Sequence, residues 1–196
     1  MERGEEVTDL VTHKSYDPLV GSLCGCNSGR SRTTGCEDCN GYRVRCNECF
    51  IESHKESRFH WAKVWDDRGF FVRKDISTLR DGGYATTLGH GGEQCPTNVA
   101  TAVAPLLARV VHLNGVHGTL IHFCHCSGVG DKFTQMKDDG LFPGSAKDPE
   151  TCFTTDVLRH FHLLSNQSKI SAYNYFATLQ RLTDNVFTRD VQVSAK

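Results

Sequence analysis

The first third of this chain carries too few hydrophobic side chains to fold by burial alone. Residues 1–22 show no apolar periodicity, and we expect them to form a flexible lead-in. Between positions 23 and 62, cysteine, histidine and glycine stand where a core would need aliphatic residues. Such a segment cannot offset the entropy of ordering its backbone by burial. The region 23–62 therefore needs another source of stability.

Hydrophobic patterning in the middle of the chain predicts β structure across residues 63–127. The dipeptide Asn114-Gly115 is typical of a type I′ hairpin turn. It is flanked by the apolar segments 110–113 and 116–123, so we expect His112 and His117 to face each other across the turn. The alanine-rich residues 98–109 predict a loop or a helical turn.

Two C-terminal windows repeat apolar side chains at helical spacing. The first contains Val157, Leu158, Phe161 and Leu164. The second contains Tyr173, Phe176, Leu179 and Leu182. Thr154 or Thr155 can cap the first helix, and Ser168 or Ser171 the second. Residues 128–150 are polar and glycine-rich and predict a connection with little regular structure. The fold class is therefore α+β.

Cysteine usage narrows the class of protein. Ten of the 196 residues are cysteine, which fits either a disulfide scaffold or metal binding. The chain opens without the apolar segment of a secretory signal, and no run approaches the ~18 apolar residues of a membrane span. We therefore expect an intracellular protein whose cysteines stay reduced. Interleaved histidines favour zinc, because histidine forms no disulfide.

Close pairs of ligands between positions 24 and 60 predict two tetrahedral zinc sites. The eight candidate ligands are Cys24, Cys26, Cys36, Cys39, Cys46, Cys49, His54 and His60. Sequential pairing would join each pair to the next one along the chain. Crosswise pairing would join Cys24 and Cys26 to Cys46 and Cys49, and Cys36 and Cys39 to His54 and His60. The pattern resembles a B-box or related cross-brace finger, which favours the crosswise arrangement.

A second constellation predicts a third zinc ion between positions 90 and 126. Its candidate ligands are His90, Cys95, Cys124 and Cys126. His117 is the alternative ligand, but strand alternation places it on the face opposite Cys124. Cys152 stands alone, and we expect it to be a small buried hydrophobe.

Charge argues against a dedicated nucleic-acid binder. The formal net charge is −1 and the isoelectric point is near 6.8. DNA-binding domains are normally basic. A local basic run provides candidate nucleic-acid contacts or simply a solvated surface: Arg30, Arg32, Arg43 and Arg45.

The order of these motifs resembles the cysteine-cluster domain, of the second CxC type, that accompanies fungal KDZ-type transposases. The resemblance runs from about Cys24 to Asn185. It rests on Cys-Gly-Cys at 24–26, the Cys/His pairs to His60, Leu88-Gly89-His90, Cys95-Pro96, Asn114-Gly115-Val116-His117, Phe123-Cys124-His125-Cys126, Leu141-Phe142-Pro143 and Arg181-Leu182-Thr183-Asp184-Asn185. It implies a zinc-binding accessory module of a DNA transposase, and therefore a nuclear location. The family's RNase H-like catalytic region would follow position 196, and we identify no acidic triad within the chain.

These observations predict a lead-in (1–22), a two-zinc module (23–62) and a cysteine-cluster domain with a β-hairpin and two helices (63–190). We expect a non-catalytic module that binds DNA or a protein chain, with no membrane and no small-molecule substrate as a partner. A B-box-like self-association module unrelated to transposition is the alternative. A zinc hydrolase or a cysteine nucleophile would need an open metal position or a reactive Cys–His pair.

Overall fold

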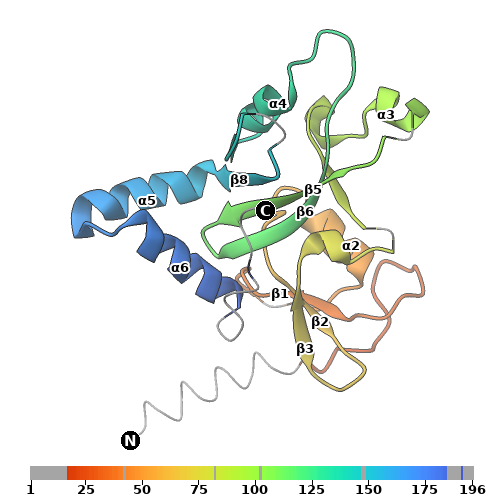
Figure 1. Ribbon diagram of the computed structural model, residues 1–196. Coiled ribbons are helices and arrows are strands. Elements are labelled where there is room, and N and C mark those ends of the chain that lie inside the picture. The colour runs from red at the N-terminus through yellow and green to blue at the C-terminus, as the bar shows by residue number, and fades with distance from the viewer. Residues whose placement is uncertain are drawn as a thin grey trace, which may run out of the picture. The chain divides into compact units, whose positions relative to one another are not determined.

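Two compact units make up the computed structural model, Met1–Gly82 and Gly83–Lys196. Residues 17–41, 43–81, 83–101, 103–146, 149–184 and 191 are described. Most of the expected lead-in, residues 1–16, lies outside them. Helices and sheets occur in both units, as the α+β prediction requires (Figure 1). The division falls after position 82, so strands at 62–74 belong to the first unit.

An antiparallel three-stranded sheet forms the framework of the first unit. Its strands are β1 (Thr34–Cys36), β2 (Ala62–Trp65) and β3 (Phe71–Lys74), in that spatial order. The described part of this unit also contains helix α2 (Asn47–Ser53) and the short 3-10 helix η1 (Ile76–Thr78). Among the described residues of this unit the buried apolar side chains, cysteines aside, are few: Val44, Phe50, Ile51, Phe59, Trp61, Ala62, Ile76 and Leu79.

A mixed five-stranded sheet forms the centre of the second unit, in the order β4-β6-β5-β8-β7. Its strands are β4 (Ala85–Thr87), β5 (Leu106–His112), β6 (Gly115–His122), β7 (Leu141–Pro143) and β8 (Thr151–Thr154). β5 pairs antiparallel with β6 and parallel with β8, while β4 runs parallel to β6. The long β5–β6 ladder is the predicted hairpin.

The hairpin turn differs from the prediction. His112 pairs with Gly115, and His117 pairs with Val110, so the turn residues are Leu113 and Asn114. Neither turn residue has a positive φ, whereas a type I′ turn requires it at both. The prediction of a type I′ turn at Asn114-Gly115 was therefore wrong. The observed register pairs Val111 directly with Val116, and both valines are buried in the cluster beneath the helices.

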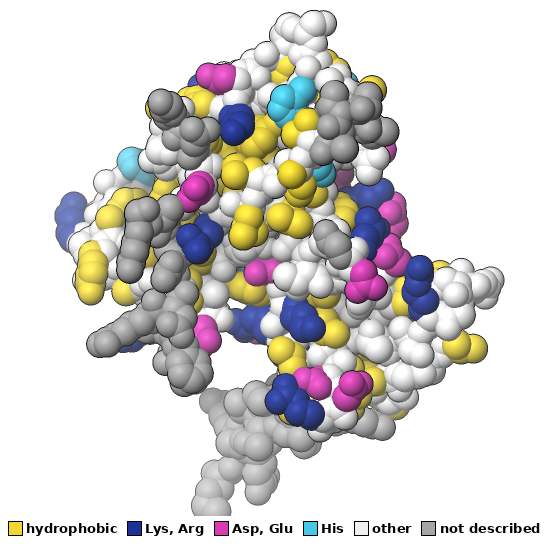
Figure 2. Space-filling model, turned by 45° about the vertical axis from the view of Figure 1, so that its right-hand side comes forward, with side chains coloured by type: hydrophobic (Ala, Val, Ile, Leu, Met, Phe, Trp, Pro, Cys, Tyr) yellow, Lys and Arg dark blue, Asp and Glu magenta, His cyan; other side chains and the backbone are white. Residues whose placement is uncertain are grey.

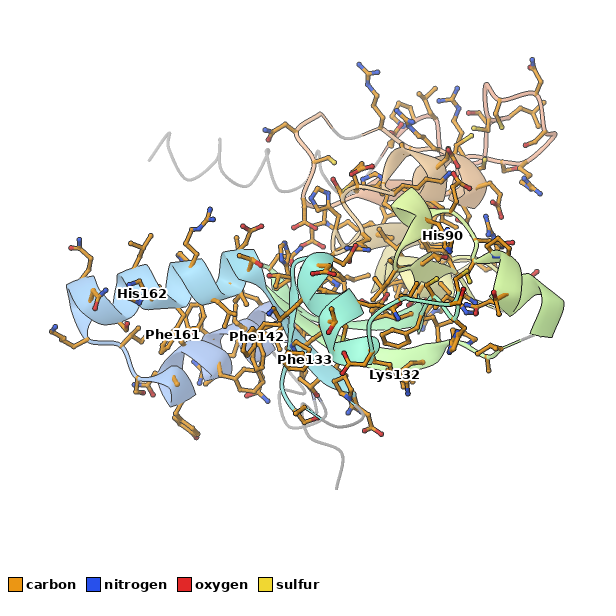
Figure 3. The ribbon with its side chains drawn as sticks, turned by 90° about the horizontal axis from the view of Figure 1, so that it is seen from above. His90, Lys132, Phe133, Phe142, Phe161 and His162 are labelled. Carbon is orange, nitrogen blue, oxygen red and sulfur yellow. The ribbon has the colours of Figure 1, made fainter. Side chains whose placement is uncertain are left out.

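Residues 128–150 are more regular than expected. They contain helix α4 (Lys132–Asp138) and strand β7, so the prediction of an irregular connection was wrong. Asp131 caps α4 by accepting a hydrogen bond from the Thr134 amide at 2.8 Å. Met136 is fully buried, and the Phe133 and Phe142 rings meet edge to face 6.5 Å apart (Figure 3). Tertiary packing stabilises a segment whose composition alone is typical of a loop.

The two predicted C-terminal helices are present. Helix α5 (Thr155–Ser168) is capped by Thr154 and helix α6 (Ala172–Thr183) by Ser171. Their apolar faces pack against β5 and β6 through a cluster of Val111, Val116, Val157, Tyr175 and Leu179. None of the described helices is long and apolar enough to cross a membrane.

The segment 96–109, which leads into the hairpin, contains a helix followed by the start of a strand. Residues 96–101 form helix α3 (Pro96–Thr101), and β5 already begins at Leu106. The prediction of a loop or helical turn at 98–109 therefore holds only for the residues before 106, because the rest belong to β5. Cys152 is fully buried in β8, as expected for a small hydrophobe, and its thiol faces the Arg109 carbonyl.

Candidate metal centres

Helix α2 of the first unit positions ligands at both of its ends. Cys46 is its N-cap residue, Cys49 lies in its first turn and His54 is its C-cap residue. Residues three apart on a helix lie on one face, so Cys46 and Cys49 converge on one centre. His54, more than a turn further along, is directed to a second one. One seven-residue helix thus connects two ligand groups.

The first group gathers Cys24, Cys26, Cys46 and Cys49. The Cys24 and Cys49 sulfurs are 3.9 Å apart, and the Cys26 and Cys46 sulfurs are 3.8 Å apart. A disulfide would hold them about 2.05 Å apart. Four thiolates at ~2.3 Å from one tetrahedral zinc lie about 3.8 Å from each other. The observed spacing is therefore that of a four-cysteine metal centre.

The second group gathers Cys36, Cys39, His54 and His60. Cys39 Sγ lies 3.4 Å from His54 Nε2 and 3.5 Å from His60 Nδ1. His54 Nδ1 is 2.9 Å from the Phe50 carbonyl oxygen, to which it donates its hydrogen, and this leaves Nε2 free to bind a cation. Burial lowers the pKa of His54, which favours the neutral imidazole that metals bind. The crosswise pairing is the one that the structure brings together.

Thiols in these groups resist ionising together. A hydrogen bond from the Ser28 hydroxyl lowers the pKa of Cys26 to about 6. Hydrogen bonds to Cys26 and Cys46 raise the pKa of Cys49 to about 12. Burial raises the pKa of Cys36 to about 12. Adjacent thiolates repel one another, and a divalent cation is the group that would stabilise them all in the ionised form.

The third group lies in the second unit and gathers His90, Cys95, Cys124 and Cys126 (Figure 3 labels His90). The Cys95 sulfur is 3.7 Å from those of both Cys124 and Cys126. His90 Nε2 lies 3.1 Å from the Cys124 sulfur and 3.5 Å from that of Cys126. These are again the separations of ligands around one small cation. The two cysteines that follow β6 thus meet the loop that precedes α3.

Three neighbours hold the third group in place, and none of them was among the predicted ligands. Gln135 accepts a hydrogen bond from the Cys124 amide at 2.7 Å and donates one to the Cys124 carbonyl at 3.0 Å. Asn98 donates to the Phe123 carbonyl at 2.6 Å. Gly89 has a φ of 82°, and a Cβ there would lie 3.4 Å from the Cys124 Cβ. Such contacts orient metal ligands and tune affinity.

Other predicted site residues lie elsewhere. His117 is buried, and its Nε2 is 2.9 Å from Asn114 Oδ1 in the hairpin, so the structure does not bring it to the third group. Arg32 donates to the carbonyls of Leu23 and Val44, at 3.1 and 3.4 Å, and therefore braces the chain around the first group. Arg30 and Arg43 are exposed and Arg45 is half-buried.

The donor chemistry of all three groups fits zinc. The first group consists of four cysteines, the second of two cysteines and two histidines, and the third of three cysteines and one histidine. Within each group the ligand atoms lie within 4.8 Å of one another. Structural zinc sites use these ligand sets in tetrahedral geometry, and four protein ligands leave no position for an activated water. These groups can hold a cation and stabilise the fold around it.

Comparison with known families matches residues 79–187 to "CxC2 like cysteine cluster associated with KDZ transposases". The match covers more than half of the 196 residues. It contains the third group and most of the second unit, and it leaves the first two groups outside. No curated protein matches the chain, and no solved structure does.

Proposed function

The chain belongs to the family of CxC2-like cysteine clusters associated with KDZ transposases, and from this premise we propose that it is a non-catalytic, zinc-stabilised accessory module that binds a protein partner of the transposition machinery. One observation carries the proposal. Each of the three Cys/His groups offers four protein ligand atoms to one cation. A centre saturated by protein ligands stabilises structure and activates no substrate.

Zinc is the metal that these ligand sets favour. Thiolate and imidazole together suit zinc, whereas magnesium and calcium prefer oxygen ligands. Cobalt(II) can replace zinc and reports its surroundings by its visible spectrum. We expect cobalt-loaded protein to show tetrahedral, thiolate-rich centres that do not change with pH through the range in which a bound water would ionise. A pH-dependent spectrum or a bound exogenous anion would reveal an open position and contradict the non-catalytic role.

The charge distribution favours a protein over DNA as the partner. On the face in Figure 2, basic and acidic side chains are interspersed. Three of the described arginines form ion pairs with acidic residues: Arg68 with Asp66, Arg73 with Glu37 and Arg80 with Glu48. Such pairs offer few free cations to a phosphate backbone. A transposase partner would place the protein in the nucleus.

DNA remains the second candidate, because Arg30, Arg43 and Arg45 lie in one small region of the first unit. The Arg45 backbone bridges to Thr34, beside the segment that carries Arg30. A gel-shift titration across salt separates the two partners. We expect no retardation of duplex or single-stranded DNA even at low salt. Tight binding that weakens steeply with salt, and is lost in Arg43→Ala/Arg45→Ala, would favour DNA instead.

Self-association offers a further test of the same proposal. Sedimentation of the zinc-loaded chain should show a monomer if its partner is a different protein. A concentration-dependent dimer would favour the self-associating, B-box-like alternative.

A further inference from the structure

A cavity of about 420 Å³ adjoins the third metal centre within the second unit. It is lined by Thr87, Gln94, Cys95, Asn98 and His122, and by the apolar residues 103–105. Ligand pockets of proteins commonly begin at about 300 Å³. Cys95 is at once a wall of this cavity and a member of the third Cys/His group. A cation there would fix one wall.

The sheet provides the other wall. Thr87 ends β4, and in the parallel β4–β6 pair it lies in register with His122 at the end of β6. Residues in register on adjacent strands project from the same face of a sheet. In the described sheet β4 is an edge strand, hydrogen-bonded to β6 alone. The cavity therefore adjoins an edge strand of the described sheet.

The polar side chains of the cavity differ in whether they are already hydrogen-bonded within the protein. Asn98 is already bonded to the Phe123 carbonyl at 2.6 Å and to His125 Nδ1 at 2.7 Å. His122 Nδ1 is buried and has no hydrogen-bond partner among the described residues. A buried polar atom left without a partner costs about 1–3 kcal/mol. Thr87, Gln94 and His122 are the side chains that could recognise a ligand.

The lining excludes two kinds of ligand. It contains no Asp, Glu, Lys or Arg among the described residues, so it offers no counter-charge to an ionised group. It contains no Phe, Tyr, Trp or Arg among them either, so it lacks the platform on which proteins stack nucleobases. A neutral group that both donates and accepts hydrogen bonds fits these constraints, and a carboxamide has both functions side by side. It can therefore satisfy either tautomer of His122.

We propose that this cavity recognises the carboxamide side chain of a glutamine or asparagine in a partner protein. The partner segment is extended and pairs with the outer edge of β4, so that alternate side chains point toward the sheet face and one enters the cavity. Backbone pairing supplies affinity and the pocket supplies specificity, as in other strand-addition complexes. The inference rests on the proposed protein-binding function and names the chemistry of its partner.

The test uses the zinc-loaded full chain and NMR titration with short peptides. The probes are Ac-Val-Gln-Val-NH2 and matched peptides with Leu, Glu or Lys at the centre. We expect the glutamine peptide to bind with a Kd on the order of 1 mM and to shift the Thr87, Gln94 and His122 resonances. The three matched peptides should bind about tenfold more weakly, because each leaves the polar groups of the cavity unpaired.

Two variants and a control assign the binding to this cavity. Gln94→Ala and Thr87→Val should each weaken the glutamine peptide several-fold, about the effect of one lost hydrogen bond. Gln167→Ala, at an exposed position of α5, should leave binding unchanged. Equal binding of the leucine peptide, stronger binding of deoxynucleosides, or no binding by a folded chain would each overturn the inference.

Zinc content is measured on the same samples. A chain that binds no zinc and does not fold in solution contradicts the metal scheme and, with it, the proposed function. A zinc-loaded, folded chain with an unresponsive cavity contradicts the carboxamide pocket alone. The two failures are thus distinguishable.

Discussion

The two units of this protein combine the same kind of ligand group with very different cores. The first unit places two Cys/His groups around one seven-residue helix and a three-stranded sheet. The second places one group at the end of a five-stranded sheet whose hairpin is covered by helices of 14 and 12 residues. Eight ligands thus serve the first unit and four the second.

This difference shows two ways of offsetting conformational entropy. In the first unit the buried side chains include the ligands Cys24, Cys36, Cys46 and His54, so cation binding and core formation are one event. In the second, Cys95 and Cys124 are buried as well, but the cluster of Val111, Val116, Val157, Tyr175 and Leu179 contains none of the group's ligands. We expect the first unit to depend on metal and the second to be partly independent of it.

Metal removal should separate the units most strongly. Structural zinc contributes about 10–16 kcal/mol of apparent binding energy in small fingers. After chelation, we expect amide signals of residues 17–81 to collapse to unfolded positions, while those of β5, β6, α5 and α6 keep their dispersion. Residue-resolved NMR before and after chelation measures this. Equal loss of dispersed amide signals in both units would contradict the proposed difference in their dependence on metal.

Cys46→Ser tests the first unit without damaging the start of α2. Cys46 is 1% exposed and is the N-cap residue, where serine is favourable, so the helix cap is preserved. We expect one zinc fewer per chain and unfolding of the first unit at temperatures where the second stays folded. Elemental analysis and thermal unfolding report both effects.

Cys152→Ala is the matched control for Cys46→Ser. Cys152 is equally buried but outside every group, so its removal should cost about 1 kcal/mol and leave the zinc content unchanged. Full stability and zinc content in Cys46→Ser would contradict the first centre.

Val157→Ala probes the core of the second unit. Val157 is 2% exposed in the cluster under α5 and α6. Its truncation should cost about 2–3 kcal/mol through lost burial and a cavity, with the zinc content unchanged. Leu163 in the same helix α5 is 55% exposed and serves as the control. Leu163→Ala should change the free energy of unfolding by less than about 0.5 kcal/mol. Denaturant unfolding measures the free energy of unfolding of both variants. Loss of zinc in Val157→Ala would mean that core packing and metal binding are coupled in the second unit as well.

Gln135→Ala should give the smallest effect, confined to the third centre. Both hydrogen bonds that hold the Cys124 backbone disappear, and outer contacts of this kind change metal affinity about 10–100-fold. Competition with a chelator measures that affinity, with Lys137→Ala in the same helix as the control. An unchanged affinity would show that Cys124 needs no such support.

Much of the candidate site could be predicted from sequence because chelating ligands are close pairs with fixed spacing. Cys24-x-Cys26 and Cys46-x2-Cys49 restrict where a cation can lie, and the crosswise grouping follows once α2 forms. The existence of α5 and α6 was equally clear, since each window repeats apolar residues at helical spacing and begins at a capping hydroxyl. The buried face of α6 was predicted wrongly, because Tyr173 is 83% exposed and Tyr175 is the tyrosine that packs into the core.

The remaining features depended on tertiary contacts that local pattern does not contain. Helix α4 is short and polar, and Met136 and Phe133 make it helical by packing against the unit. The hairpin register is shifted relative to the Asn114-Gly115 signal so that Val111 and Val116 pair. Gln135 and Asn98 have no distinctive spacing, so their support of the third group was visible only in the fold.

Zinc stoichiometry of the purified chain tests the central claim most directly. Elemental analysis of protein dialysed against metal-free buffer should give three zinc ions per chain, one for each Cys/His group. Two would remove one of the proposed centres, and Cys95→Ser would then identify whether the third group is the missing one. A chain without zinc that keeps the fold of residues 17–81 would contradict the account.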